Sequence, residues 1–320
     1  MERSALHWAN VRQVGPYWGM RFVLFLQSLL GTRLCLYLIT PVVAFYFLCN
    51  RHGRWASLDY LQQINLYRPA LKLTANWRTS FRHFLAFTEA MLDKLATWNG
   101  KISVNDVDIH GKDAFLSSLK GQQGAIILCS HLGNIEVSHA LANLNAHAKL
   151  NILAHTKHAQ TFNRLINHVS RSEQVELIEV TEISPAVAIM LQEKIAQGEF
   201  VCIVGDRVPV NNHTRIVACD FLGKPAYFAQ GPFILASLLK CPVYTLFCLK
   251  IEGRYHLYFE HFADQITLAR KNKALALQQY AEQFAQRLEQ YCIQAPLQWF
   301  NFYFYWHDYL AETKIGTDNK

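Results

Sequence analysis

Charged residues are scarce in this chain, and none of its cysteines forms a CxxC pair. Only 17% of the 320 residues are charged and 51% are hydrophobic, whereas an average soluble domain has about 25% charged residues. The composition excludes intrinsic disorder, and the length excludes a miniprotein held together by disulfides. Most of the eight cysteines lie inside apolar runs, which predicts buried thiols in a reducing compartment.

Several common active-site motifs are also missing. The chain has no GxSxG, GxGxxG or HExxH sequence, and none of its glycine–lysine pairs is followed by Ser or Thr as a Walker A motif requires. By motif, these absences exclude a serine hydrolase, a P-loop protein and a zincin. The N-terminus stays polar for too long to be a signal peptide.

The charge balance favours lipid or protein partners over nucleic acid. A net charge of +7 is small for a nucleic-acid-binding protein, but it suits anionic lipid headgroups or an acidic carrier protein. The mean hydropathy of +0.04 is too low for a polytopic membrane protein. Aromatic residues reach 13%, which suits a protein with a packed core and a surface that rests against lipid.

The most apolar segment covers residues 22–49. Arg33 interrupts it, and the charge-free remainder is 16 residues long, short of the roughly 20 that span hydrocarbon. One helix crosses the bilayer if Arg33 reaches the headgroups, and Arg51 and Arg54 then mark the cytoplasmic flank. The alternatives are a hairpin bent at Pro41 that lies in the interface, and an ordinary buried helix pair. We expect membrane attachment of some kind.

The pattern changes after residue 100. Residues 55–98 show a helical spacing of aromatic and basic side chains, which predicts two amphipathic helices. Beyond them, apolar runs alternate with helical stretches, which predicts an α/β domain with a mixed, largely parallel sheet flanked by helices. The predicted strands lie near 102–109, 125–130, 150–154, 175–180, 200–204 and 243–250, and the predicted helices near 135–145, 160–170, 184–197 and 231–240.

Two further patterns complete the expected fold. Gly253 predicts a hairpin turn, so one sheet edge is expected to be antiparallel. Apolar residues from Leu277 to Tyr291 recur at spacings of 3, 4, 4 and 3, which predicts a last helix over the core. The expected organisation is a membrane segment at 1–54, a helical connector at 55–99, a catalytic domain at 100–310 and a polar tail at 311–320.

A histidine–acid pair, His131 and Glu136, follows the apolar run AIILCS. The chain has three pairs with this spacing, where chance alone gives about one, and the setting of each pair separates them better than the spacing. His131 follows a predicted strand, and open α/β sheets bind ligands at the carboxyl ends of their strands. A neutral imidazole can take a proton from a hydroxyl that attacks a thioester, and a carboxylate behind the ring fixes its tautomer. We expect His131 to be a general base supported by Glu136; the alternative is a structural histidine.

Two other groups are expected beside this histidine. Gly133 and Asn134 let the backbone turn, and their N–H groups are expected to stabilise an oxyanion or hold a phosphate. Gly205-Asp206-Arg207 follows the apolar run FVCIV and is expected on the same rim. There Arg207 can bind a phosphate and Asp206 can orient it or a hydroxyl; the alternative is a strand-end turn with a local ion pair. Downstream, residues 221–232 either line an acyl channel or form an ordinary loop before a helix.

The order of these motifs along the chain resembles that of the late acyltransferases of lipid A biosynthesis. Those enzymes belong to the lysophospholipid acyltransferase superfamily. The resemblance covers about residues 15–310 and rests on His131-x4-Glu136, a mid-chain segment with Asn163, Gly205-Asp206-Arg207, Asp220-Phe-Leu-Gly-Lys-Pro, Gly231-Pro and Cys241-Pro242-Val243. It implies a glycerol-3-phosphate acyltransferase-like fold, and a single-pass or monotopic protein on the cytoplasmic face of a Gram-negative inner membrane.

The same resemblance implies an activity. A fatty acyl chain would move from acyl carrier protein, in preference to coenzyme A, to a hydroxyl of a lipid. His131 would be the base, Glu136 its partner, and Asp206 with Arg207 the polar pair on the acceptor side. The resemblance implies no metal or prosthetic group.

The chain departs from the family pattern in two places. An Arg usually precedes the mid-chain Asn, but here the segment before Asn163 offers His155, Lys157 and His158. We expect Lys157, His158 and Asn163 to bind the acceptor, or the acceptor headgroup to differ. The aromatic end at 298–306 also lacks the expected arginines, which leaves the acceptor open between lipid A and another glycolipid or lipid. A non-catalytic lipid- or carrier-binding protein on the same fold and an acyl hydrolase are the other two functions left open.

Overall fold

The computed structural model describes residues 17–98, 100–120, 123–138, 149–155, 175–180, 184–208 and 215–306. Its helices are α1 (Tyr17–Cys49), α2 (Arg51–Tyr67), α3 (Trp77–Trp98), α4 (Lys112–Lys120), α7 (Pro185–Ala196), α8 (Gly231–Leu239) and α9 (Lys273–Gln294). Its strands are β1 (Val107–His110), β2 (Ile126–Cys129), β3 (Leu150–His155), β4 (Val175–Val180), β5 (Phe200–Val204), β6 (Ile216–Phe221), β7 (Lys224–Ala229), β8 (Val243–Ile251) and β9 (Arg254–Ala263).

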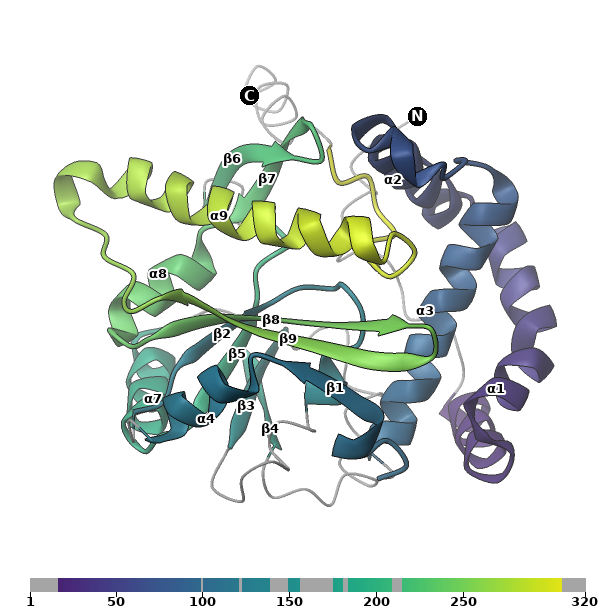
Figure 1. Ribbon diagram of the computed structural model, residues 1–320, viewed down its shortest axis with the longest axis horizontal. Coiled ribbons are helices and arrows are strands. Elements are labelled where there is room, and N and C mark those ends of the chain that lie inside the picture. The colour runs from purple at the N-terminus through teal and green to yellow at the C-terminus, as the bar shows by residue number, and fades with distance from the viewer. Residues whose placement is uncertain are drawn as a thin grey trace, which may run out of the picture.

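A seven-stranded sheet forms the centre of the fold (Figure 1). Its order is β1-β9-β8-β2-β5-β3-β4, and every neighbouring pair is parallel except β8 with β9. The central strand β2 is buried along its whole length, as an all-apolar strand covered on both faces should be. The α/β class and the largely parallel sheet predicted from the sequence are confirmed.

Alternate residues of the central strands pack into two separate hydrophobic cores, one on each face of the sheet. Ile126 and Leu128 of β2 belong to one core, which includes Phe284 and Leu288 of α9, and α9 lies across this face of the sheet (Figure 1). Ile127 belongs to the other core, with Phe115 of α4. Seven of the eight cysteines are buried, and Cys49 is exposed. Both faces of the sheet are therefore covered by packed side chains. A ligand site is then expected at the ends of the strands.

The predicted hairpin at Gly253 joins β8 to β9. Its two turn residues, Glu252 and Gly253, have φ values of 52° and 85°, the left-handed pair that a tight two-residue hairpin needs. Strand β1 pairs with β9 in parallel outside this hairpin. The antiparallel pair therefore lies inside the sheet, and not at its edge as predicted.

A second sheet was not predicted. Strands β6 and β7 form an antiparallel pair within residues 216–229. Their turn is Leu222-Gly223, with φ values of 52° and 76°. Phe221 and Phe228 are fully buried in the core that contains α9. Most of residues 221–232, expected to form a channel wall or an ordinary loop, is thus a hairpin packed on the core.

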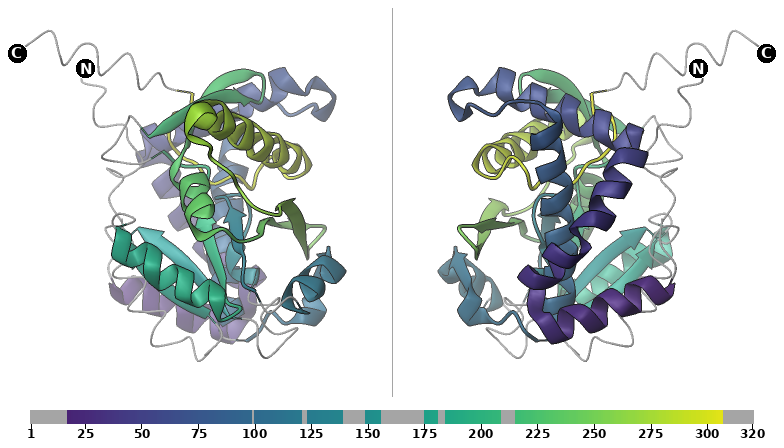
Figure 2. Two further views of the ribbon diagram at one scale, coloured as in Figure 1. Left: turned by 90° about the vertical axis from the view of Figure 1, so that its left-hand side faces the viewer. Right: turned by 90° about the vertical axis from the view of Figure 1, so that its right-hand side faces the viewer.

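Helix α1 is broken near its middle. Gly31 has φ 74° and ψ 172°, outside the helical region, whereas Pro41 lies within a continuous stretch of helix. The bend that one of the alternatives placed at Pro41 is therefore at Gly31, where glycine tolerates a positive φ. Beyond the break, α1 runs along α3 (Figure 2). Phe47 is buried there against Phe84, with ring centroids 5.2 Å apart.

Arg54 closes the C-terminal end of α1. Its Nη1 atom donates hydrogen bonds to the carbonyl oxygens of Phe47 and Leu48, at 2.5 and 2.8 Å. Its guanidinium also lies over the ring of Trp77, 4.6 Å from the centroid. A cation at a helix C-terminus opposes the negative end of the helix dipole. Arg54 is buried, so it caps a helix and does not form the exposed basic flank that the sequence suggested.

A chain of buried hydrogen bonds joins α2 and α3 to residues 299–301, called here the C-terminal segment. Ser80 donates to Ser57 at 2.9 Å, and Ser57 lies 3.0 Å from Nδ1 of His83. The other ring nitrogen of His83, Nε2, lies 3.0 Å from the carbonyl oxygen of Trp299. All four residues are buried.

We expect the protein to lose stability as the pH falls from about 6.5 to about 4, because burial lowers the pKa of His83 from 6.5 to about 4. The unfolded chain then binds the proton more readily than the folded chain. The contribution is complete above pH 6.5 and falls by about 1.4 kcal/mol per pH unit below it, to a total of about 3 kcal/mol.

His83→Gln tests this expectation, because glutamine keeps an N–H donor but does not titrate. Its free energy of unfolding in urea, followed by tryptophan fluorescence, should depend less on pH by up to about 3 kcal/mol between about pH 7 and pH 4. A variant with the same pH dependence as the wild type would contradict the expectation.

Candidate active site

The register of β2 and β5 brings two polar side chains together. Cys129 pairs with Val204 at the carboxyl ends of these parallel strands, and the N–H group of Gly205 continues the pairing by donating to the carbonyl of Cys129 at 2.9 Å. His131 and Asp206 lie two residues beyond the paired strand ends. They therefore stand side by side at the rim where open α/β sheets bind ligands.

His131 and Asp206 share two hydrogen bonds. The backbone N–H of His131 donates to Oδ2 of Asp206 at 2.9 Å, and the ring Nδ1 lies 2.8 Å from Oδ1. The side chain of Asp206 is fully buried, whereas 29% of the His131 side chain is exposed. The imidazole is thus bonded to a buried carboxylate, while the side chain as a whole is partly exposed.

Two residues of the C-terminal segment complete the surroundings of this carboxylate. Nε1 of Trp299 and Nδ2 of Asn301 donate to Oδ2 of Asp206, at 2.9 and 3.0 Å. Burial raises the pKa of Asp206, but the charge and hydrogen bonds of His131 and the charge of Arg207 outweigh this effect and hold the pKa at about 2. Asp206 is therefore ionised at neutral pH and accepts four hydrogen bonds.

This carboxylate determines the state of His131. An ionised carboxylate only accepts hydrogen bonds, so Nδ1 of His131 carries the proton and Nε2 keeps its lone pair. Burial and the charges of Arg207 and Lys94 lower the pKa of His131, against the opposing influence of Asp206. The ring is therefore neutral at pH 7, with Nε2 able to take a proton.

Arg207 is bound to the C-terminal segment. Its Nε donates to Oδ1 of Asn301 at 2.8 Å, and its Nη2 donates to the carbonyl of Phe300 at 3.1 Å. Asp206 and Arg207 were expected to form a polar pair for the acceptor. The structure instead places Asp206 behind His131, without exposed surface, and Arg207 against the segment that supplies hydrogen-bond donors to Asp206.

Glu136 does not occupy the position expected from the sequence. It lies in the 3-10 helix η5 (Ile135–Ser138) and forms an ion pair with Lys94 of α3. Both side chains are largely buried. The short helix begins directly after Asn134, and it directs Glu136 toward α3. The carboxylate on the His131 ring is thus Asp206, which comes from the neighbouring strand, in place of Glu136.

The backbone N–H groups of Gly133 and Asn134 are already paired. Gly133 donates to the carbonyl of Gln298 at 2.8 Å, and Asn134 to the carbonyl of Cys248 at 3.0 Å. These bonds replace the oxyanion or phosphate contacts that the sequence suggested. Gly133 has φ 71°, and a Cβ atom there would collide with the carbonyl oxygen of Cys248. Only glycine lets the chain pass this close to β8.

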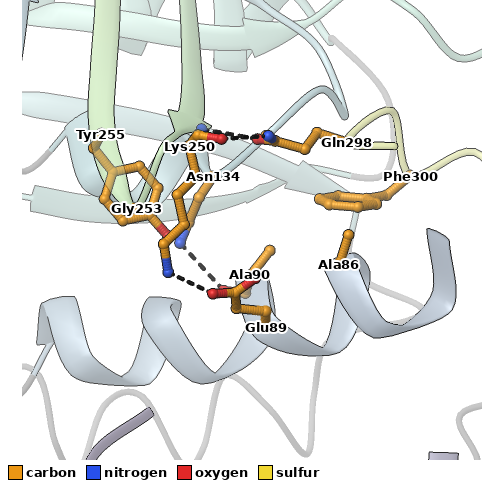
Figure 3. Close-up of a pocket in the computed structure, with 10 residues that line it drawn as sticks. Ala86, Glu89, Ala90, Asn134, Lys250, Gly253, Tyr255, Gln298 and Phe300 are labelled. Carbon is orange, nitrogen blue, oxygen red and sulfur yellow. Dashed lines mark hydrogen bonds and ion pairs between the residues drawn. The ribbon is translucent and has the colours of Figure 1, made fainter. Parts of the chain in front are cut away.

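A pocket of about 160 Å³ adjoins this turn (Figure 3). It is lined by Ala86, Glu89 and Ala90 of α3, by Lys250, Gly253 and Tyr255 of the β8–β9 hairpin, and by Gly133, Asn134, Gln298 and Phe300. Lys250 Nζ lies 2.7 Å from Glu89 and 2.6 Å from Asp93, and the Tyr255 hydroxyl donates to Asp93 at 2.6 Å. This network fastens α3 to the hairpin beside the His131 turn.

Two residues at the site were not identified from the sequence, Trp299 and Asn301. They lie more than 90 positions from Asp206, and no short motif connects them. Asn301 could have been recognised from the sequence, because it interrupts the aromatic run WFNFYFYW with an amide side chain. Lys157, His158 and Asn163, predicted to bind the acceptor, lie outside the described residues.

The chain matches a family model over most of its length. The model, described as bacterial lipid A biosynthesis acyltransferase, covers residues 23–307 and so includes the whole site. A search of curated proteins found no match.

Proposed function

Because the chain belongs to the bacterial lipid A biosynthesis acyltransferase family, we propose that it moves a fatty acyl chain from a thioester to a lipid hydroxyl, with His131 as general base. Acyl carrier protein is the proposed donor, and a glycolipid or another lipid the acceptor. The site would face the cytoplasmic side of an inner membrane.

The strongest support is the pairing of His131 with Asp206. A buried carboxylate that holds Nδ1 and leaves Nε2 basic is the arrangement that a neutral general base requires. The His131 side chain is partly exposed, and the proposal places the acceptor hydroxyl at Nε2. Glu136 contributes through Lys94 in this proposal, by balancing a cation that otherwise lowers the pKa of His131.

The proposed reaction has two steps. Nε2 of His131 takes the proton of the acceptor hydroxyl while its oxygen attacks the thioester carbonyl carbon, and a tetrahedral intermediate forms. The carbon–sulfur bond then breaks, and the imidazolium returns the proton to the leaving thiolate. The products are an ester and a free thiol. Asp206 stabilises the imidazolium between the steps, and a base of this kind contributes about 10²–10⁴ in rate.

Helix α1 is the proposed membrane contact. The stretch Phe25–Cys49 is long and apolar enough to cross a membrane. Its exposed large side chains are Phe25, Leu29, Leu34, Tyr37, Leu38, Val42, Phe45, Tyr46 and Leu48. However, α1 packs along α3 (Figure 2), and a spanning α1 would pull Arg82 and Glu89 of α3 into hydrocarbon at high cost. We therefore place α1 along the bilayer interface, with its exposed face in the lipid.

Replacing Tyr37 and Phe45 together with aspartate should release the protein from membranes. These side chains are 77% and 63% exposed, so the change should leave the fold intact. Two carboxylates on a lipid-facing helix cost several kcal/mol by insertion scales, or roughly a hundredfold or more in partitioning. Co-sedimentation with vesicles that contain anionic lipid measures the effect.

Ile189 of α7 and Leu275 of α9 supply the matched control. They are 59% and 56% exposed and lie on other helices, so their double aspartate variant should bind vesicles as the wild type does. Equal loss of binding in both double variants would rule out α1 as the membrane contact.

The preference for a carrier protein is supported by a basic surface. Residues 60–88 contain no Asp or Glu. Their exposed cations, Arg68, Lys72, Arg78 and Arg82, lie at the turn between α2 and α3 and on the first half of α3. A surface of one sign attracts an acidic partner and speeds its association. We therefore expect acyl carrier protein to be a better donor than coenzyme A, with an advantage that falls as salt rises.

Lipid analysis tests the function directly. Mass spectrometry of lipids from cells with and without the gene should show one acyl chain missing from one lipid class, which names the donor length and the acceptor together. The purified protein should transfer that chain from its thioester to the under-acylated lipid. Binding of the carrier without turnover would favour a non-catalytic protein, and release of free fatty acid would favour a hydrolase.

A further inference from the structure

Residues 299–301, the C-terminal segment of the site, connect Asp206 to the helical layer. The Trp299 and Asn301 side chains donate to Asp206, and the Phe300 N–H donates to the carbonyl of His131 at 2.9 Å. Leu132 and Trp299 also form an antiparallel bridge. The position of this segment therefore sets the positions of both His131 and Asp206.

His83 of α3 holds the segment from the other side. It is fully buried, and its Nε2 lies 3.0 Å from the carbonyl oxygen of Trp299. Its ring also packs on Phe302, with centroids 4.6 Å apart. Trp299 thus presents its carbonyl to His83 and its indole N–H to Asp206.

The hydrogen-bond directions are fixed along the whole chain. A carbonyl oxygen only accepts, so Nε2 of His83 carries the proton and Nδ1 accepts from the Ser57 hydroxyl. Ser57 in turn accepts from Ser80. Every donor has one acceptor, so the ring of His83 has a single orientation and tautomer.

We propose that His83 is a positioning residue for the base, which holds Asp206 and His131 in their reactive arrangement through residues 299–301. It touches neither substrate nor the His131 ring in this role. The proposal deepens the acyl-transfer function above and rests on it for the chemistry. A purely structural histidine would instead contribute to folding and leave the properties of His131 unchanged.

Two substitutions separate these roles. In His83→Gln, the side-chain amide reaches the position of Nε2 and can still donate to Trp299. In His83→Asn, the shorter amide sits near Nδ1, so it can contact Ser57 but not Trp299. Both variants remove the imidazole, and they differ in the hydrogen bond that the proposal requires.

The expected result is a large difference between the two variants. In His83→Asn, the loosened segment weakens the donors to Asp206 and admits water near His131. The groups that set the His131 pKa are Asp206, Arg207, and Lys94 with its partner Glu136. With less burial and a less satisfied carboxylate, the pKa of His131 should rise by about half a unit to one unit. The kcat should fall about 10- to 100-fold, as expected for a misplaced catalytic group. His83→Gln should restore most of both properties.

Two readouts keep the outcomes distinct. The pH profile of kcat/KM reports the base through catalysis, and nitrogen NMR of labelled histidine reports the pKa and tautomer of His131 without any turnover. Equal activity losses in both variants, with no change in the His131 pKa, would overturn the proposal. If the wild type proves inactive on every lipid, a pKa shift confined to His83→Asn would still support the role of His83 while the proposed reaction fails.

His52→Asn is the matched control. His52 packs on Phe304, close to the same segment, with ring centroids 5.3 Å apart, and no hydrogen bond connects it to Trp299 among the described residues. Its activity and His131 pKa should match the wild type. A shift as large as that of His83→Asn would mean that loss of packing, and not the Trp299 hydrogen bond, explains the effect.

Discussion

His131→Ala should lower the rate constant for acyl transfer by about 10²–10⁴, the range that a general base contributes. The change leaves Oδ1 of the buried Asp206 without its Nδ1 donor, so we expect a loss of stability of about 1–3 kcal/mol, whereas membrane binding should be almost unchanged. The measurement is single-turnover acyl transfer from the carrier thioester, which separates chemistry from binding. The KM for the thioester should change little, because the proposed role of His131 is to act on the attacking hydroxyl.

His110→Ala is the control for this loss. His110 is an exposed histidine on β1, where it stacks on Tyr258. Its removal should leave the rate constant at the wild-type value. Retention of full activity in His131→Ala would eliminate His131 as the base and the proposed mechanism with it.

Asp206→Asn should lower kcat about as much as loss of His131 does, although it replaces only one carboxylate oxygen by an NH₂ group. Three donors converge on Oδ2 of Asp206, from the His131 backbone, Trp299 and Asn301, whereas only Nδ1 of His131 meets Oδ1. An asparagine should therefore turn its oxygen toward the three donors and its NH₂ toward His131. Nδ1 then becomes an acceptor, and the ring proton moves to Nε2.

The expected loss in kcat is about 10³–10⁴, because this tautomer has no lone pair at Nε2 to accept a proton; the same exchange of tautomer underlies the loss in a Ser-His-Asp triad. Nitrogen NMR of labelled His131 should show protonation at Nε2 in place of Nδ1. Asp108→Asn, at an exposed ion pair with Arg254, is the control and should change neither property. An active Asp206→Asn variant with an unaltered tautomer would refute this account of the site.

The position of His131 was predictable from the sequence because it depends on local pattern. An apolar run too short for a core helix ends at Ser130, and the next polar residues fall at a strand end. The same reasoning placed Asp206 after FVCIV. Parallel neighbouring strands end at a common edge, so two independent local patterns converge on one rim.

The partner of the histidine was not predictable, because it depends on register. Glu136 is close to His131 in sequence, whereas Asp206 becomes its neighbour only once Cys129 pairs with Val204. Trp299 and Asn301 need a further step, the passage of the C-terminal segment beside the His131 turn. Contacts of this kind are set by tertiary packing and leave no periodic signal in the chain.

The β6–β7 hairpin and the break in α1 were not predicted, and each omission has a physical reason. Pro225 and Asp220 interrupt the apolar alternation of β6 and β7, and their turn has Leu222 where hairpins usually place Asn, Asp or Gly. In α1, Pro41 is the more obvious helix breaker, but the positive φ falls at Gly31. The φ that proline fixes is compatible with a helix, whereas the positive φ at the break is one that glycine adopts readily.

The passage of residues 299–301 beside the His131 turn also bears on how the protein is made. The ribosome makes α1 well before Trp299, so under the proposed membrane contact a growing chain can meet the membrane while Asp206 still lacks two of its four donors. In the proposed arrangement, the nascent sheet then lies at the membrane before His131 and Asp206 are organised. Under the proposed mechanism, acyl transfer therefore begins only after residues 299–301 have joined the His131 turn.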